Sequence, residues 1–219
     1  MRWTRVECAL NNVEFTIGKA KILMVQGDIT DFDADAIVNA ANSSLTGGGG
    51  VDGAIHWKGG SKILEECKRI RANEWPDGLP TGKAVMTSGG NMKAKHVIHT
   101  VGPVWHDGSH GEPELLEQAY YNSLRLAVFK GLKTVAIPSI STGAYGYSIR
   151  NASRIAIATV MRFLSKEDKL DKVVFVLFTK QDLEIYAQTA KEISSKVAYE
   201  SVTQLVNESA SSLLRKSLE

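Results

Sequence analysis

The sequence predicts an α/β fold with a largely parallel sheet and helices on both of its faces. Short apolar runs rich in β-branched residues alternate along the chain with longer segments of helical periodicity. This alternation is typical of parallel sheets, because the connection between two parallel strands usually crosses the sheet as a helix. Most of the runs are continuously apolar, which indicates strands that are buried on both faces.

The predicted strands begin with Val13–Ile17, where apolar and polar residues alternate as in an edge strand. Six further segments are short, mostly β-branched or aromatic, and bounded by Gly, Pro or Asp: Ile22–Val25, Ala36–Val38, Ala84–Thr87, Val97–Val101, Val135–Pro138 and Val173–Phe178. We therefore expect a sheet of six or seven strands.

Helices are predicted between these strands. Three segments have apolar residues at the spacing of an amphipathic helix: Gly53–Arg71, Pro113–Lys130 and Asn151–Ser165. A final helix at Leu183–Val197 is expected to pack on the domain, so that one domain spans residues 1–197. Residues 198–219 keep a helical apolar spacing among Ser, Glu and Lys. This C-terminal helical tail either folds back on the domain as an amphipathic helix or serves self-association, and both interpretations stay open.

The composition narrows the classes of partner and location. The 219 residues carry a formal net charge of +2, which is too small to indicate nucleic-acid binding by bulk electrostatics. The two cysteines, Cys8 and Cys67, lack metal-ligand spacing and suggest a reducing compartment. There is no run of about 18–20 apolar residues and no signal-peptide pattern. We expect a cytoplasmic protein with no membrane partner.

Open α/β sheets bind ligands beyond the carboxyl ends of their strands, so the residues after each predicted strand are candidates. The first such place is Gly27–Thr30. Asp28 could accept a hydrogen bond from an exocyclic amine such as that of adenine. It could equally cap the turn that follows, which Asp often does.

The second place is the glycine run Gly47–Gly50, which follows an Asn-rich strand end and leads into a helix near Val51. Glycines let backbone N–H groups approach a ligand closely, and the helix start adds the positive end of its dipole. The run therefore predicts an anion site suited to a pyrophosphate, with a flexible turn as the alternative. No Lys-Ser/Thr pair follows, so the pattern is not that of an NTPase loop.

The third place is the small-residue loop Pro138–Ser148, which could present further amides to phosphate. Tyr145 offers a flat surface for a sugar, or it packs in the core. Two anion loops at the ends of two strands of one sheet suggest a diphosphate held between them.

Asp52 and His56 lie four residues apart at the start of a helix and therefore share one of its faces. Beside an anion site, Asp52 could activate a water as general base, and a nearby diphosphate would raise its affinity for a proton. The alternatives are a dipole-favoured Asp and a half-exposed His. We expect structural roles for the other histidines, His96, His99, His106 and His110, and neither a metal ion nor a cofactor.

At these residues the sequence resembles the macrodomain family, and in particular the MacroD-like branch of ADP-ribosyl hydrolases. Five ordered segments carry the resemblance: Gly27–Thr30, Ala36–Ser43, Gly47–His56, Val97–Pro103 and Pro138–Gly143. The resemblance implies a three-layer α/β/α sandwich with a mixed, mostly parallel sheet, and it covers roughly residues 13–197.

The resemblance also implies a role for each site residue. Asp28 would bind the adenine amine beside the Ile29 backbone, and Phe178, where the family often has Tyr, would pack on the adenine. Asn42 would hold the distal ribose, Asp52 would position the attacking water near C1″, and His56 would support it. The diphosphate loops would be formed by Gly48, Gly49, Gly50 and Val51 and by Ser141, Thr142, Gly143, Ala144 and Tyr145, with Tyr145 also against the distal ribose.

The activity implied is hydrolysis of an ester at C1″ of ADP-ribose by a positioned water. The substrates would be proteins mono-ADP-ribosylated on Asp or Glu, or O-acetyl-ADP-ribose, and the ligand would be ADP-ribose itself. A non-catalytic ADP-ribose reader would share the binding loops but would not need Asp52. A module for RNA or poly(A) is disfavoured by the weak net charge and by the lack of an aromatic and basic stripe.

Overall fold

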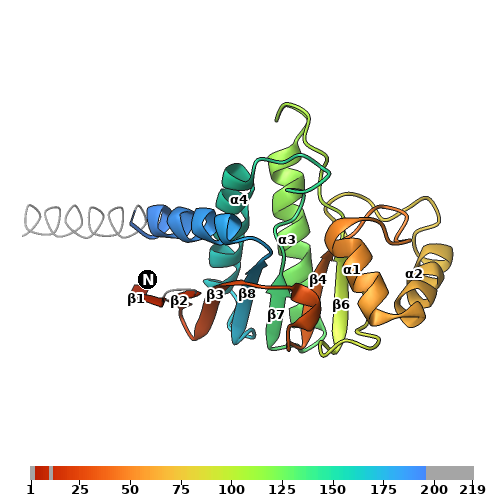
Figure 1. Ribbon diagram of the computed structural model, residues 1–219, viewed down its shortest axis with the longest axis horizontal. Helices are drawn as coiled ribbons and strands as arrows, with labels where there is room; N and C mark the ends of the chain where they lie inside the picture. The colour runs from red at the N-terminus through yellow and green to blue at the C-terminus, as the bar shows by residue number, and fades with distance from the viewer. Residues whose placement is uncertain (1–2, 10–11, 196–219) are drawn as a thin grey trace, which may run out of the picture.

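The computed structural model describes residues 3–9 and 12–195, and these form a three-layer α/β/α sandwich around one eight-stranded sheet (Figure 1). The strand order is β1-β2-β3-β8-β7-β4-β6-β5. The strands are β1 Trp3–Ala9, β2 Asn12–Ile17, β3 Ala20–Gln26, β4 Ala36–Ala40, β5 Ala84–Ser88, β6 His96–Thr100, β7 Thr134–Ile137 and β8 Lys172–Leu177. The predicted α/β/α class is therefore confirmed.

The sheet is mixed, with a parallel centre and antiparallel borders. Strands β3, β8, β7, β4 and β6 are parallel to their neighbours in that order, whereas β1–β2–β3 and β5–β6 pair antiparallel. The carboxyl ends of the five parallel strands consequently meet at one edge of the sheet.

The expectation that Val13–Ile17 forms the edge strand is wrong. This segment lies within β2, which is flanked by β3 on one side and by β1 on the other. Arg5 and Glu7 interrupt the apolar pattern of β1, and charged residues of this kind are common on edge strands. The strand therefore escaped detection by its apolar content.

The helices are α1 Gly50–Gly59, α2 Ser61–Asn73, α3 Glu112–Phe129 and α4 Ile149–Leu164, with a short 3-10 helix η1 at Ile29–Asp31 and helical residues 180–195. The single helix predicted over Gly53–Arg71 is in fact two. The helix is interrupted at Gly60, whose φ of +80° is not helical and is disfavoured for residues with a Cβ.

Two apolar cores show why the sheet is covered on both faces. Alternate residues of one strand point to opposite faces. In β8, Val173 and Phe175 pack with α3, α4 and the helical residues 180–195, whereas Val174 packs with α1 and α2. Tyr186 is fully buried in the first core, as expected for the predicted final helix.

The predicted tail over residues 198–219 lies outside the described residues. Within residues 3–9 and 12–195, none of the helices combines the length and the apolar character needed to cross a membrane.

Candidate active site

The predicted binding residues follow neighbouring strands at the carboxyl edge of the sheet. In the order of the strands, Asp28 follows β3, Phe178 follows β8, the loop of residues 139–145 follows β7, and Asn42 follows β4. The backbone N–H of Gly27 donates to the carbonyl of Leu177 at 2.9 Å, which joins the first two ends. Residues distant in sequence therefore form one row.

A cavity of about 320 Å³ occupies the part of this row beyond β7 and β4. Ten predicted site residues line it: Asn42, Gly48, Gly49, Gly50, Val51, Asp52, Ser141, Gly143, Ala144 and Tyr145. Asp28, Ile29 and Phe178 lie on the same edge but do not line this cavity. Thr142 and His56 do not line it either, and they contact the lining residues Ser139 and Asp52, respectively.

The first glycine loop lies directly against the helix that follows it. Helix α1 begins at Gly50, with Gly49 as its extended N-cap. A Cβ on Gly53 would lie 2.3 Å from the carbonyl oxygen of Gly48, a distance that no side chain could tolerate. The close approach brings the loop and the unpaired N–H groups of the helix start to one wall of the cavity, where they suit an anion.

The second loop contains a strained residue. Ser141 has a φ of +67°, which is uncommon outside glycine. Its hydroxyl is buried and makes no hydrogen bond within the described residues. A Cβ on Gly102 would lie 2.1 Å from this hydroxyl, so only glycine fits opposite. A strained, unpartnered hydroxyl at a cavity wall is a good candidate for contact with a ligand.

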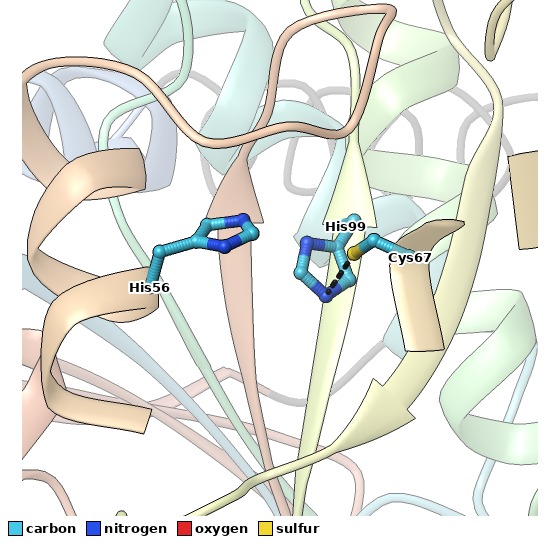
Figure 2. A group of neighbouring side chains, drawn as sticks. All are labelled: His56, Cys67 and His99. Carbon is cyan, nitrogen blue, oxygen red and sulfur yellow. Dashed lines mark hydrogen bonds between the residues drawn. The ribbon is translucent and has the colours of Figure 1, made fainter. Parts of the chain in front are cut away.

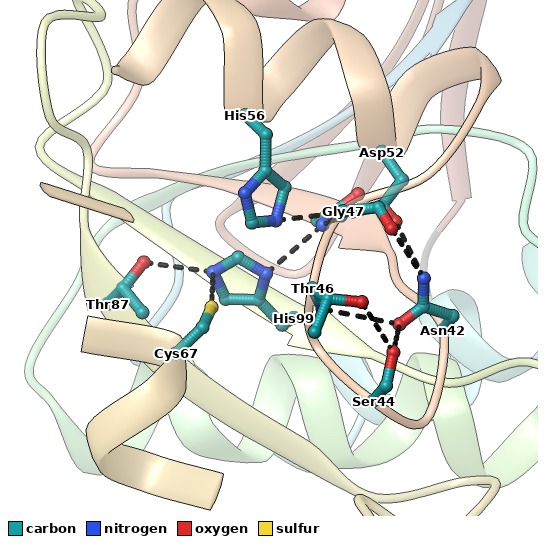
Figure 3. Close-up of polar contacts among 10 residues, drawn as sticks. Asn42, Ser44, Thr46, Gly47, Asp52, His56, Cys67, Thr87 and His99 are labelled. Atoms are coloured by element: carbon teal, nitrogen blue, oxygen red, sulfur yellow. Dashed lines mark hydrogen bonds and ion pairs between the residues drawn. The ribbon is translucent and has the colours of Figure 1, made fainter. Parts of the chain in front are cut away.

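Asp52 lies at the end of the cavity, and its side chain is only 7% exposed. Asn39 Nδ2 donates to Asp52 Oδ1 at 2.7 Å, and Asn42 Nδ2 lies 3.5 Å from Asp52 Oδ2 (Figure 3). Asn42 also donates to the carbonyl of Gly47 at 2.8 Å. One amide thus links the carboxylate to the glycine loop.

The environment of Asp52 makes its carboxylate easier to protonate than that of an exposed aspartate. Burial raises the pKa of Asp52, and the hydrogen bond from Asn39 and the neighbouring His56 oppose this rise only in part. His56 Nε2 lies 3.5 Å from Asp52 Oδ1, one helical turn along α1. A carboxylate with a raised pKa at a cavity wall is suited to exchange protons with a water.

A second layer of buried polar groups lies behind Asp52. Asn39 Nδ2 is 3.1 Å from His99 Nδ1, and His99 Nε2 is 2.9 Å from Thr87 Oγ1. Burial and, to a smaller extent, the nearby His56 lower the pKa of His99 to about 3, so His99 is neutral. Sequence reasoning gave Asn39 no role at Asp52 and His99 only a structural one. The available signal was a polar residue within each of two buried strands.

The side chains of His56, Cys67 and His99 lie close together and raise the question of a metal site (Figure 2). One potential ligand atom from each lies within 4.8 Å of the others. Both ring nitrogens of His99, however, are engaged by Asn39 and Thr87. Burial, together with Asp52 and Glu66, raises the pKa of Cys67 to about 12, which disfavours the thiolate that a metal requires. The donor set does not fit a metal ion.

At the end of the row opposite Asp52, the side chains of Asp28 and Phe178 are exposed to solvent. Asp28 is exposed, and its Oδ1 accepts hydrogen bonds from the N–H and the hydroxyl of Thr30 at 2.9 and 2.8 Å. Asp28 therefore does cap the turn, as one of the two interpretations expected. Phe178 is 77% exposed, which is unusual for a large apolar side chain and leaves its ring available for stacking.

A second cavity lies away from the predicted site residues. It measures about 580 Å³ and runs along the edge strand β5. Within it, the Glu66 carboxylate accepts hydrogen bonds from the N–H and the hydroxyl of Ser88 at 2.7 and 2.8 Å. These bonds occupy the N–H and the hydroxyl of Ser88. Neither the glycine loops nor Asp52 line this second cavity.

Comparison with known proteins places these observations in a family. The family model described as Macro domain matches residues 38–156. A protein of Escherichia fergusonii named O-acetyl-ADP-ribose deacetylase is 49% identical over 168 residues, covering 77% of this chain and 94% of that protein.

Solved structures agree with this match. The Oceanobacillus iheyensis macrodomain with ADP superposes with a TM-score of 0.82 at 42% identity, covering 84% of this chain and 97% of that one. The Trypanosoma brucei macrodomain in complex with ADP-ribose gives a TM-score of 0.70 at 38% identity, covering 76% of this chain and 68% of that one.

Proposed function

The chain belongs to the macro domain family, and we propose that it binds ADP-ribose along the carboxyl edge of its sheet and hydrolyses an ester at C1″ of the distal ribose. The observation that carries this proposal is Asp52, a buried carboxylate with a raised pKa at the wall of a cavity that two glycine-rich loops enclose.

The row of strand ends matches the order of groups in ADP-ribose. The adenine would lie between the Asp28 carboxylate and the exposed ring of Phe178, with the Ile29 backbone beside it. The diphosphate would lie between the loop of residues 48–51 and the loop of residues 141–145. The distal ribose would then reach Asn42, Tyr145 and Asp52. Structures of relatives with ADP and with ADP-ribose support this class of ligand.

The chemistry requires little beyond the positioning of a water. Asp52 would accept a proton as the water attacks C1″, and the bond between C1″ and the ester oxygen breaks. The leaving carboxylate takes that electron pair and Asp52 then releases its proton to solvent, so the products are ADP-ribose, a free carboxylate and a proton. Because such an ester is already activated, a positioned water and a held diphosphate can supply most of the rate acceleration. His56 and Asn42 would hold Asp52 in place.

Two ester substrates fit the same site. The relative named O-acetyl-ADP-ribose deacetylase supports the small molecule. We extend the proposal to proteins mono-ADP-ribosylated on Asp or Glu, because both substrates join a carboxylic acid to the distal ribose through an ester. Cys67 is an unpaired buried thiol. A free thiol agrees with the cytoplasmic location that we predict from the cysteine content. Cell fractionation tests that location.

The test combines binding with turnover. Calorimetry should give a dissociation constant for ADP-ribose on the order of 1 μM, because a few charge-assisted hydrogen bonds and one stacked base reach about −8 kcal/mol. A protein mono-ADP-ribosylated on glutamate should release free ADP-ribose when the enzyme is added. Binding only in the millimolar range would refute the binding half, and tight binding without release from either ester would make the chain a reader.

A further inference from the structure

A line of buried polar side chains runs from the edge of the sheet to Asp52. It begins at Thr87 on β5, passes through His99 on β6 and Asn39 on β4, and ends at Asp52 on α1. Figure 3 shows the contact between Thr87 and His99 and the position of Asp52. Asn39 and His99 are register partners on adjacent parallel strands, so their side chains project to the same face. Thr87, His99, Asn39 and Asp52 are each at most 5% exposed.

One assignment of donors and acceptors satisfies every contact in this line, and it places the His99 proton on Nε2. The Thr87 hydroxyl donates to the carbonyl of Ser88 at 3.0 Å, so its oxygen is left to accept from His99 Nε2. His99 therefore carries its proton on Nε2, and Nδ1 accepts from Asn39 Nδ2. The second hydrogen of the same Asn39 nitrogen is then directed at Asp52 Oδ1.

We propose that His99, with Thr87, is a positioning residue for Asp52: it orients the Asn39 amide so that its nitrogen faces the carboxylate. This inference rests on the proposed function, in which Asp52 activates the water. Without an acceptor at Nδ1, the Asn39 amide loses one of the two contacts that distinguish its nitrogen from its oxygen, the other being Asp52 itself. An amide oxygen turned toward Asp52 would repel the carboxylate, so the line of hydrogen bonds keeps the base in its reactive orientation.

Three titratable groups surround Asp52 from the elements packed against it. They are His56 on α1, Cys67 on α2 and His99 on β6. The low pKa of His99 keeps its Nδ1 lone pair available at every assay pH. The high pKa of Cys67 keeps that thiol neutral. The acid limb of activity should therefore report Asp52, and changes at His99 act on it through Asn39.

The experiment compares three variants, one at His99 itself and two at side chains that contact its ring. His99→Phe keeps a planar ring but removes the acceptor, and Thr87→Val keeps the shape of Thr87 but removes the acceptor for Nε2. Cys67→Ala is the matched control, because Cys67 Sγ makes a longer contact of 3.8 Å with His99 Nε2 and not with Nδ1, the nitrogen that faces Asn39. Each variant is assayed for thermal unfolding, ADP-ribose affinity, kcat and KM against pH, and the carboxyl NMR titration of Asp52.

His99→Phe should lower kcat about tenfold with KM and ADP-ribose affinity nearly unchanged, because only the base is misplaced. The Asp52 pKa should rise by roughly one unit as its hydrogen bond weakens, moving the acid limb to higher pH. Thr87→Val should show the same changes more weakly, and it tests the proposal even if His99→Phe fails to fold. Cys67→Ala should show neither change.

Two results would overturn the proposal. One is a wild-type Asp52 titration and pH profile in a folded Thr87→Val or His99→Phe variant. The other is an equal loss in Cys67→Ala, which would reduce the effect to packing. The NMR titration needs no turnover, so it tests the positioning of Asp52 even if the ester assays show that the proposed hydrolysis is absent.

Discussion

Asp28 and Asp52 are aspartates at opposite ends of one row of strand ends, and their surroundings differ in almost every respect. Asp28 is exposed, and both of the hydrogen bonds to its Oδ1 come from Thr30, two residues away. Asp52 on α1 is buried, and its two partners lie outside that helix: Asn39 lies on β4, and Asn42 follows that strand. One carboxylate is organised by its own turn and the other by the tertiary fold.

The difference indicates how one side-chain type can serve two purposes in a single site. An exposed carboxylate at a turn can accept a hydrogen bond from a ligand amine. A desolvated carboxylate has a raised pKa and can exchange a proton with a water. In this account the open end selects the ligand and the buried end performs the chemistry.

The largest expected effect is at the buried end. Asp52→Asn keeps the shape of the side chain but removes the base, so kcat should fall by about 10²–10⁴-fold. The dissociation constant of ADP-ribose should stay within about threefold of wild type, because the phosphate loops are intact. Rapid-quench turnover and calorimetry measure the two quantities. A variant that retains most of its turnover would show that Asp52 is not the base.

A change at the open end should give the opposite result. Asp28→Asn preserves an oxygen for Thr30 but removes the charge offered to the adenine amine, so ADP-ribose binding should weaken roughly tenfold or more with kcat nearly unchanged. Asp31→Asn is the matched control, since Asp31 is an exposed aspartate of the same turn that pairs with Lys58. If both variants bind equally, Asp28 has no specific role in the ligand site.

The smallest expected effect concerns stability. A folded-state pKa raised above the unfolded value stabilises the fold at low pH, and this contribution is lost as the pH rises through the folded value. Burial raises the pKa of Asp52, so ionising it near neutral pH costs stability. Asp52→Asn should therefore unfold a few degrees higher than wild type at pH 7 and no higher in acid. Calorimetric scans across this range measure the difference, and an equal gain at both pH values would contradict it.

Much of the fold could be predicted from the sequence because its signals are local. The seven predicted strands lie on β2 to β8, since apolar content and bounding Gly, Pro or Asp are readable one segment at a time. The break at Gly60 was missed because the prediction treats the Gly59-Gly60 pair, which is itself a turn signal, as part of one continuous helical pattern. The edge strand β1 was missed because its charges conceal it.

The site was predictable to a similar depth. Glycine runs at strand ends indicate anion loops, and these line the cavity. The partners of Asp52 were not predictable, because the contact between Asn39 and His99 depends on which strands are neighbours and in what register. A spacing of 60 residues separates the two, and no local pattern encodes that pairing.

The central claim is that this macro domain hydrolyses an ADP-ribose ester with Asp52 as the base. The most direct measurement is single-turnover release of acetate from O-acetyl-ADP-ribose, with enzyme in excess, across the acid and neutral pH range. We predict a first-order release that slows as the pH falls through the raised Asp52 pKa while ADP-ribose affinity holds. Tight binding with no acetate released at any pH would contradict the account.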